Sequence, residues 1–65
     1  MTYNNTAEII RRIRFEKRLT QAEMAEKVGT TKARISRIEN EQNDIKYNEL
    51  QSWCKILEVS LIQFM

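Results

Sequence analysis

Apolar residues recur along this chain at intervals of three and four, the spacing that gathers them on one face of an α-helix. Ile9, Ile10 and Ile13 form the first such stripe and predict a helix that runs to about Lys17. The preceding sequence, Asn5-Thr6-Ala7-Glu8, has the form of a capping box, a typical start of a helix. The N-terminal part of the chain is therefore predicted to be helical.

Two more helices are predicted in the middle of the chain. A second capping box, Thr20-Gln21-Ala22-Glu23, predicts the start of a helix that ends at Gly29. Thr30 or Thr31 is the expected N-cap of the next helix. The buried faces of these helices are expected to consist of Met24, Ala25 and Val28 in the first and of Ile35 and Ile38 in the second.

The last third of the chain predicts a fourth and a fifth helix. Residues 41–46 form a polar connection without apolar spacing. The stripe of the fourth helix consists of Leu50, Trp53, Cys54 and Leu57. A third capping box, Ser60-Leu61-Ile62-Gln63, predicts a short terminal helix. Since no repeat, low-complexity stretch or linker interrupts the pattern, residues 1–65 are predicted to form one all-α domain.

The composition removes several classes of protein. The 65 residues include no Pro and one Gly, whereas strand-rich folds need turn residues at each reversal. With no His and one Cys, the usual zinc sites, His-based acid–base chemistry and an intrachain disulfide are excluded. The apolar runs are too short for a membrane span or a signal peptide. We therefore expect no enzyme activity, metal, cofactor or membrane partner, and a reducing, intracellular location.

Charge is distributed unevenly, although the net charge is only +2. Residues 9–37 hold nine Lys or Arg and three Glu, whereas residues 38–65 hold two Lys and five Asp or Glu. This asymmetry indicates a basic face and an acidic or neutral face. Taken alone, it is equally consistent with the solvated surface of an ordinary helical protein.

Residues 21–39 carry the most informative spacing. The two helices predicted there are joined by a tight turn at Gly29, where the chain reverses through a left-handed conformation that side chains resist. Ala25 is small enough for the second helix to cross the first closely. The outward face of the second helix consists of Lys32, Ala33, Ser36 and Arg37. This is the geometry of a helix-turn-helix, whose second helix enters the major groove of DNA.

The chain resembles the Cro/phage-repressor (XRE-type) helix-turn-helix regulators over roughly residues 10–64. The pattern Thr-Gln-x-x-x-Ala-x-x-x-Gly-x-x-x-x-x-Ile-Ser-x-Ile-Glu, from Thr20 to Glu39, carries the resemblance. Its flanks match at Ile10-Arg11, Ile13-Arg14, Leu50, Leu57 and Val59-Ser60-Leu61. The resemblance implies a compact five-helix, lambda-repressor-like DNA-binding domain and a sequence-specific transcriptional regulator, with repression as its expected action.

The family motif also assigns residues that face the base edges of double-stranded DNA. These are Thr31, Lys32, Ala33, Arg34 and Arg37. Lys32 and Arg37 can each donate to guanine O6 and N7, and Arg37 can do so through two nitrogens. Ala33 would contact a thymine methyl group, and Arg34 lies at the edge, within reach of a base or a phosphate. For each of these side chains, a phosphate contact is the alternative to base reading.

Other positions of the motif match residues that hold the DNA backbone. They are Gln21, Ser36, Asn40, Gln42 and Asn43. In relatives, the Gln at position 21 also supports the recognition helix; a plain polar helix start is the alternative. The loop at 40–43 offers short amides and free backbone N–H groups, and a solvated loop is its alternative. Arg14 and Glu39 match a structural pair that fixes the docking angle.

The resemblance further implies a homodimer on a pseudo-palindromic operator, with recognition helices about 34–36 Å apart. Its contact is expected at Val59, Ile62 and Met65, unless these are simply frayed terminal hydrophobics. The alternatives are an antitoxin-like module that binds a toxin or another regulator, and an autoregulating controller protein of a restriction-modification system. Any of these would be cytoplasmic in a prokaryote or phage and associated with the nucleoid through DNA.

Several positions depart from the family pattern. Relatives commonly have Gly near the ends of three helices, where this chain has Arg18, Glu41 and Glu58, so strained caps are expected there. Phe15 stands where a charged residue is usual. It either packs under the C-terminal segment or contributes to a partner surface.

Overall fold

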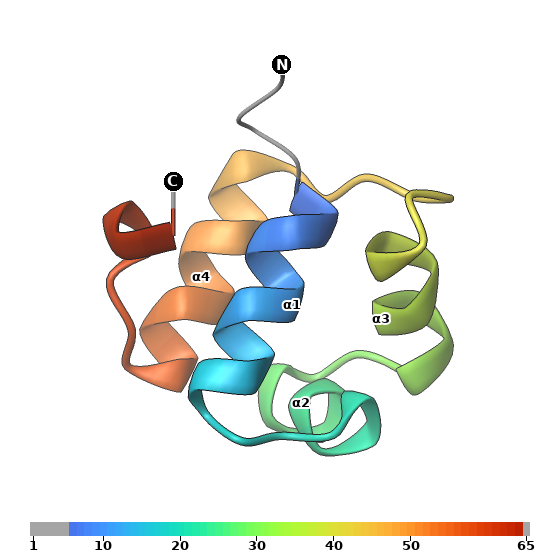
Figure 1. The fold of residues 1–65 in the computed structure, drawn as a ribbon, viewed down its shortest axis with the longest axis horizontal. Helices are drawn as coiled ribbons and strands as arrows, with labels where there is room; N and C mark the ends of the chain where they lie inside the picture. The colour runs from blue at the N-terminus through green and yellow to red at the C-terminus, as the bar shows by residue number, and fades with distance from the viewer. Residues whose placement is uncertain (1–5, 65) are drawn as a thin grey trace.

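The computed structural model describes residues 6–64, which form four α-helices and one short 3-10 helix and contain no strand (Figure 1). The elements are α1 (Thr6–Glu16), α2 (Gln21–Val28), α3 (Lys32–Glu39), α4 (Tyr47–Leu57) and the 3-10 helix η1 (Leu61–Phe64). α3 packs against α1 and α2, α2 also packs against α4, and η1 packs against α1. The predicted all-helical class is confirmed.

The local signals of the sequence determine the ends of α2 and α3. The Thr20 hydroxyl accepts the Glu23 N–H at 3.1 Å and the Glu23 carboxylate accepts the Thr20 N–H at 2.9 Å, so the predicted capping box forms. Gly29 ends α2 with a φ of 82°. Of the two possible N-caps of α3, Thr31 is used, and its hydroxyl accepts the Arg34 N–H at 3.1 Å.

The expectation of five α-helices is wrong at the C-terminal end. η1 is a single 3-10 turn, in which the Gln63 N–H donates to the Ser60 carbonyl three residues earlier, at 3.1 Å. The spacing of a capping box does not by itself distinguish a 3-10 turn from an α-helix, because one turn offers few bonds of either type. The capping box predicted at Asn5 lies outside the described residues.

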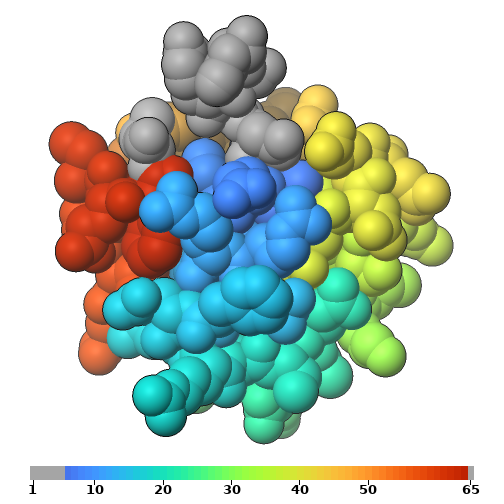
Figure 2. Space-filling model, viewed as in Figure 1, coloured from blue at the N-terminus to red at the C-terminus, as the bar shows by residue number. Residues whose placement is uncertain are grey.

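The apolar stripes meet in one core. Ile10, Met24, Ile35 and Ile38 are fully buried, and all four residues of the predicted α4 stripe are buried as well. Ile45 is buried too. The sequence does not predict this burial, because the other residues of 41–46 are polar and a single apolar residue leaves no periodic signal. On the face shown in Figure 2, α1 lies at the centre, with η1 on one side and α3 and its following loop on the other.

Three helix ends contain a non-glycine residue in the left-handed conformation. The φ angles are 58° at Arg18, 60° at Glu41 and 60° at Glu58. These are the positions at which sequence reasoning expected strained caps. A side chain in this conformation costs roughly 1 kcal/mol relative to glycine, so the chain closes these turns at a loss of stability.

Candidate nucleic-acid interface

The turn between α2 and α3 sets the direction of the second helix. The N–H groups of Gly29 and Thr30 both donate to the Ala25 carbonyl, each at 2.9 Å, and so close the end of α2. A side chain at Gly29 would find no atom within 4 Å, so glycine is favoured there by its φ of 82° and not by lack of space. This local geometry orients α3 as the second helix of the motif.

α3 has one face in the core and one in solvent. Ile35 and Ile38 are fully buried, whereas Lys32, Ala33 and Arg37 are exposed. Its first turn contains no acidic residue, although the partial positive charge of a helix N-terminus favours acidic side chains there. A solvent-exposed helix start of this kind, with basic side chains, is suited to a polyanion.

The C-terminal end of α3 is attached to α1 and α2 through Glu39. Its carboxylate accepts the Arg14 Nε–H at 2.7 Å and an Arg14 terminal N–H at 3.0 Å. The Gln21 amide donates to the same carboxylate at 3.2 Å, and a guanidinium N–H of Arg11 reaches the Glu39 carbonyl at 3.4 Å. Arg14 also donates to the Leu19 carbonyl at 3.2 Å. Gln21 thus supports α3 directly, and its DNA contact stays a prediction.

The N-terminal end of α3 is attached to α4 through a pair that the sequence reasoning missed. The two terminal nitrogens of Arg34 each donate to one oxygen of Glu49, both at 2.7 Å. The Arg34 guanidinium also lies over the Trp53 ring, 5.5 Å from its centre. The hydrogen bond from Arg34 lowers the pKa of Glu49, and the same bond raises the pKa of Arg34. The expected base or phosphate contact of Arg34 would therefore require this pair to open.

The loop after α3 differs from expectation in its backbone. The N–H groups of residues 40–43 were expected to be free for phosphate, but all four donate to carbonyls of α3. The Gln42 N–H, for example, binds the Arg37 carbonyl at 2.8 Å. The expectation is wrong because the left-handed residue Glu41 turns the chain back over the last carbonyls of the helix. The side-chain amides remain: Asn40 is exposed and donates to the Ser36 hydroxyl at 3.4 Å, and Gln42 and Asn43 are exposed.

The comparisons with known proteins agree with this geometry. The helix-turn-helix family model matches residues 10–64, nearly all of the described chain. The chain belongs to the XRE-type helix-turn-helix family. As a member of this family it is a DNA-binding transcription regulator. A search of the curated proteins gave no significant match.

Two solved structures are similar to this helix-turn-helix regulator. One is the wild-type restriction-modification controller protein C.Esp1396I, with 33% identity and a TM-score of 0.78, covering 92% of this chain and 79% of that one. The other is a single-residue variant of the same controller protein, with 33% identity and a TM-score of 0.78, covering 92% and 76%. The likeness therefore extends over most of this chain.

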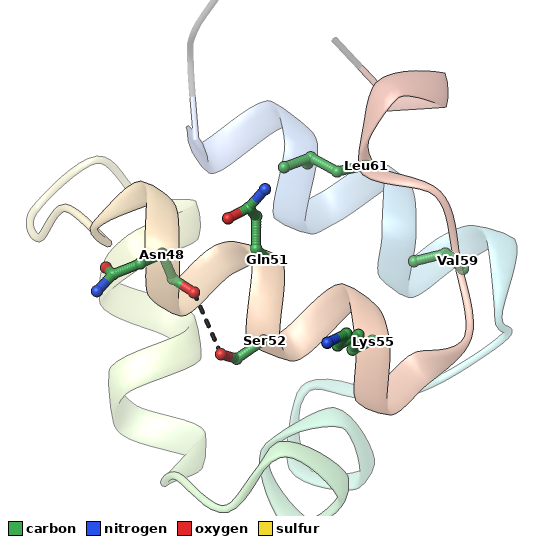
Figure 3. Close-up of a pocket in the computed structure, with 6 residues that line it drawn as sticks. All are labelled: Asn48, Gln51, Ser52, Lys55, Val59 and Leu61. Carbon is green, nitrogen blue, oxygen red and sulfur yellow. Dashed lines mark hydrogen bonds between the residues drawn. The ribbon is translucent and has the colours of Figure 1, made fainter.

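The surface expected to join two copies of the regulator is only partly apolar. Ile62 is 78% exposed and Val59 is half-buried against the core, while Met65 lies outside the described residues. Val59 and Leu61 border a groove of about 370 Å³ beside α4 (Figure 3). The α4 side of the groove is polar and consists of Asn48, Gln51, Ser52 and Lys55. The surface thus combines apolar and hydrogen-bonding groups.

The structure also shows the surroundings of Phe15 and Cys54. Phe15 is 63% exposed, so it does not pack under the C-terminal segment, and the Arg14 guanidinium lies 4.9 Å from its ring centre. Cys54 is buried, and this burial raises the pKa of its thiol. Within residues 6–64 no group of three or more Cys, Asp or Glu side chains could hold a metal ion. No helix in this range has the length and apolarity needed to cross a membrane.

Proposed function

We propose that this chain is a sequence-specific regulator that binds a pseudo-palindromic operator as a homodimer and acts as a repressor. The observation that carries the proposal is the division of α3 into the buried pair Ile35 and Ile38 and an exposed face with Lys32, Ala33 and Arg37. This division leaves the base-reading side chains free for the major groove while the core holds the helix in place. Such a protein would act on intracellular, nucleoid DNA.

A more specific role is favoured by one comparison. The 33% identity to a restriction-modification controller protein covers 92% of this chain. Control of a restriction-modification operon is therefore the second candidate, and it has the same binding chemistry. The operator selected in binding experiments distinguishes the two candidates, because it identifies the promoter at which the protein acts.

Selection of bound sequences from random duplexes tests the proposal. We expect an inverted repeat whose half-sites lie one helical turn apart, and an affinity that falls steeply between about 50 and 200 mM salt. Failure to enrich any sequence would refute the proposed function.

Arg37 is expected to read a base. Arg37→Ala should cost about 1–3 kcal/mol of binding free energy and relax the preference at one position of each half-site. Lys27→Ala is the control, because Lys27 is an exposed cation in the last turn of α2 and the substitution removes the same charge. If Arg37→Ala weakens all sequences equally, Arg37 contacts a phosphate instead.

The homodimer is tested by mass. Sedimentation equilibrium should give about twice the 7.8 kDa of the chain, and Ile62→Asp should return the mass to one chain and weaken operator binding. Ile56→Asp provides the matched control, because Ile56 is also an exposed isoleucine but lies in α4, outside the expected contact. An Ile62→Asp protein with unchanged mass and operator affinity would place the contact elsewhere.

A further inference from the structure

The recognition helix is held at both ends by a bidentate Arg–carboxylate pair. Arg14 and Glu39 attach its C-terminal end to α1, and Arg34 and Glu49 attach its N-terminal end to α4. The resemblance to the family implied the first pair, whereas the second emerges only from the structure. The second pair lies at the end of α3 that is expected to enter the major groove.

The Arg34–Glu49 pair links two helices whose backbones make few close approaches to each other. α3 packs mainly against α1 and α2, and α4 packs mainly against α2. Within the described residues, the two bonds of this pair are the hydrogen bonds that join α3 to α4. The pair therefore adds a hydrogen-bonded connection between the first turn of α3 and α4 to the hydrophobic core that both helices share.

The geometry of the pair gives it directional strength. Two parallel N–H···O bonds of 2.7 Å fix the plane of the guanidinium, and the Trp53 ring beneath it restricts the remaining movement. The side chains are only 32% and 36% exposed, so solvent screens the pair less than a fully exposed one. Arg34 stands in the first turn of α3, where a cation is unfavourable for the helix dipole, and Glu49 compensates this charge.

We infer that Arg34 and Glu49 are positioning residues for DNA recognition. The pair fixes the first turn of α3 against α4, so that the acidic side chain of Glu49 is required for specific operator binding. The inference rests on the proposed function, since it concerns the same α3 interface. In this role Arg34 does not contact a base itself. The pair instead holds the backbone of α3 in place, so that Lys32 and Arg37 can reach the bases.

The sign of the Glu49→Gln effect separates this role from simple electrostatics. Removing a negative charge near DNA strengthens binding to any sequence, because fewer repulsive interactions oppose the phosphates. Loss of a positioning pair weakens binding to the operator alone. We therefore expect Glu49→Gln to weaken operator binding about tenfold at fixed salt, while its affinity for unrelated duplex stays equal or increases.

A double-mutant cycle tests the inference on the full chain with the operator selected by the wild type. Arg34→Gln and Glu49→Gln should each weaken operator binding, Arg34→Gln more strongly because it also removes a positive charge near the phosphates, and the double variant should be no weaker than Arg34→Gln. Arg34→Lys, which keeps the charge but not the two parallel bonds, should also lose specific affinity. Far-UV circular dichroism at the assay temperature verifies that each variant is folded. If a glutamine variant is unfolded, the operator affinity of Arg34→Lys tests the inference instead.

Three results would overturn the inference, of which two come from the glutamine variants. One is operator binding by Glu49→Gln that equals or exceeds that of the wild type; the other is a double variant whose loss is the product of the two single losses. If Arg34→Lys keeps wild-type operator affinity, a charge on α3 is enough and positioning is also refuted. All three results require a wild type that selects an operator, so they differ from failure of the proposed function, in which the wild type selects none.

Discussion

Replacement of Arg14 by methionine should destabilise the domain far more than loss of an ordinary surface ion pair. The Arg14 side chain is 14% exposed and that of Glu39 is 5% exposed, so the pair is largely removed from water. Arg14→Met would leave a buried carboxylate that keeps only the hydrogen bond from Gln21. Breaking a buried pair by removing one partner typically costs about 3–5 kcal/mol.

This cost is large relative to the whole stability of the chain. A domain of 65 residues is expected to have an unfolding free energy of roughly 3–10 kcal/mol. In a domain of this size, each kcal/mol lowers Tm by about 4–8 °C, so Arg14→Met should lower Tm by at least about 12 °C. Thermal and urea unfolding followed by circular dichroism at 222 nm measure both quantities.

Two further variants make the result interpretable. Arg37→Met introduces the same side chain at an exposed position of α3 and should change stability by no more than about 0.5 kcal/mol. Arg14→Met combined with Glu39→Leu removes both charges and should recover most of the loss, because no unpaired carboxylate remains. A loss below about 1 kcal/mol in Arg14→Met would refute the reasoning, since that is the value of an exposed pair. A double variant as unstable as Arg14→Met would show that the carboxylate is not the cause.

Three other outcomes follow from the structure. Glu58→Gly should stabilise the domain by about 1 kcal/mol in urea unfolding, because glycine adopts the left-handed φ of 60° without strain, whereas Glu26→Gly inside α2 should destabilise it by about the same amount. Cys54 should resist a thiol reagent in the native protein and react rapidly in urea, because it is buried and burial raises the pKa of its thiol; rapid native labelling would contradict this. Arg34 lowers the pKa of Glu49, so the pair should stabilise the fold above the ordinary carboxyl range and cease to do so as the pH falls through the lowered value. The stability difference between wild type and Glu49→Gln should thus be present near neutral pH and shrink as the pH falls through the lowered pKa of Glu49, and a difference that stays constant in acid would exclude this titration.

The sequence predicts those features of the fold that depend on residues close together in the chain. The Thr20–Glu23 capping box and the left-handed Gly29 involve one helical turn each, so local chemistry determines them. The Arg34–Glu49 pair joins residues 15 positions apart on two helices, and its formation depends on the angle between those helices. Nothing in the local pattern around either residue encodes that angle.

The same limit applies to the candidate site. The exposed face of α3 follows from helical periodicity, because Ile35 and Ile38 fix which side is buried. The loss of free N–H groups in the loop after α3 does not, since it depends on the left-handed turn at Glu41, a residue type that rarely adopts this conformation. The backbone conformation at such strained positions, and the hydrogen bonds that follow from it, could therefore be known only from the structure.

The shortness of α3 limits how much sequence information one copy can read. Its eight residues span about 12 Å, and since base pairs follow one another every 3.4 Å or so, the helix can lie along only three or four of them. A four-base-pair word recurs by chance about once in 250 positions, and two such words about once in 65,000, against roughly a million or more competing sites in a genome. Even a pair of recognition helices would thus leave many chance matches. Base pairs that α3 does not touch can add discrimination in such a dimer, through the sequence-dependent cost of bending and narrowing the DNA between its half-sites.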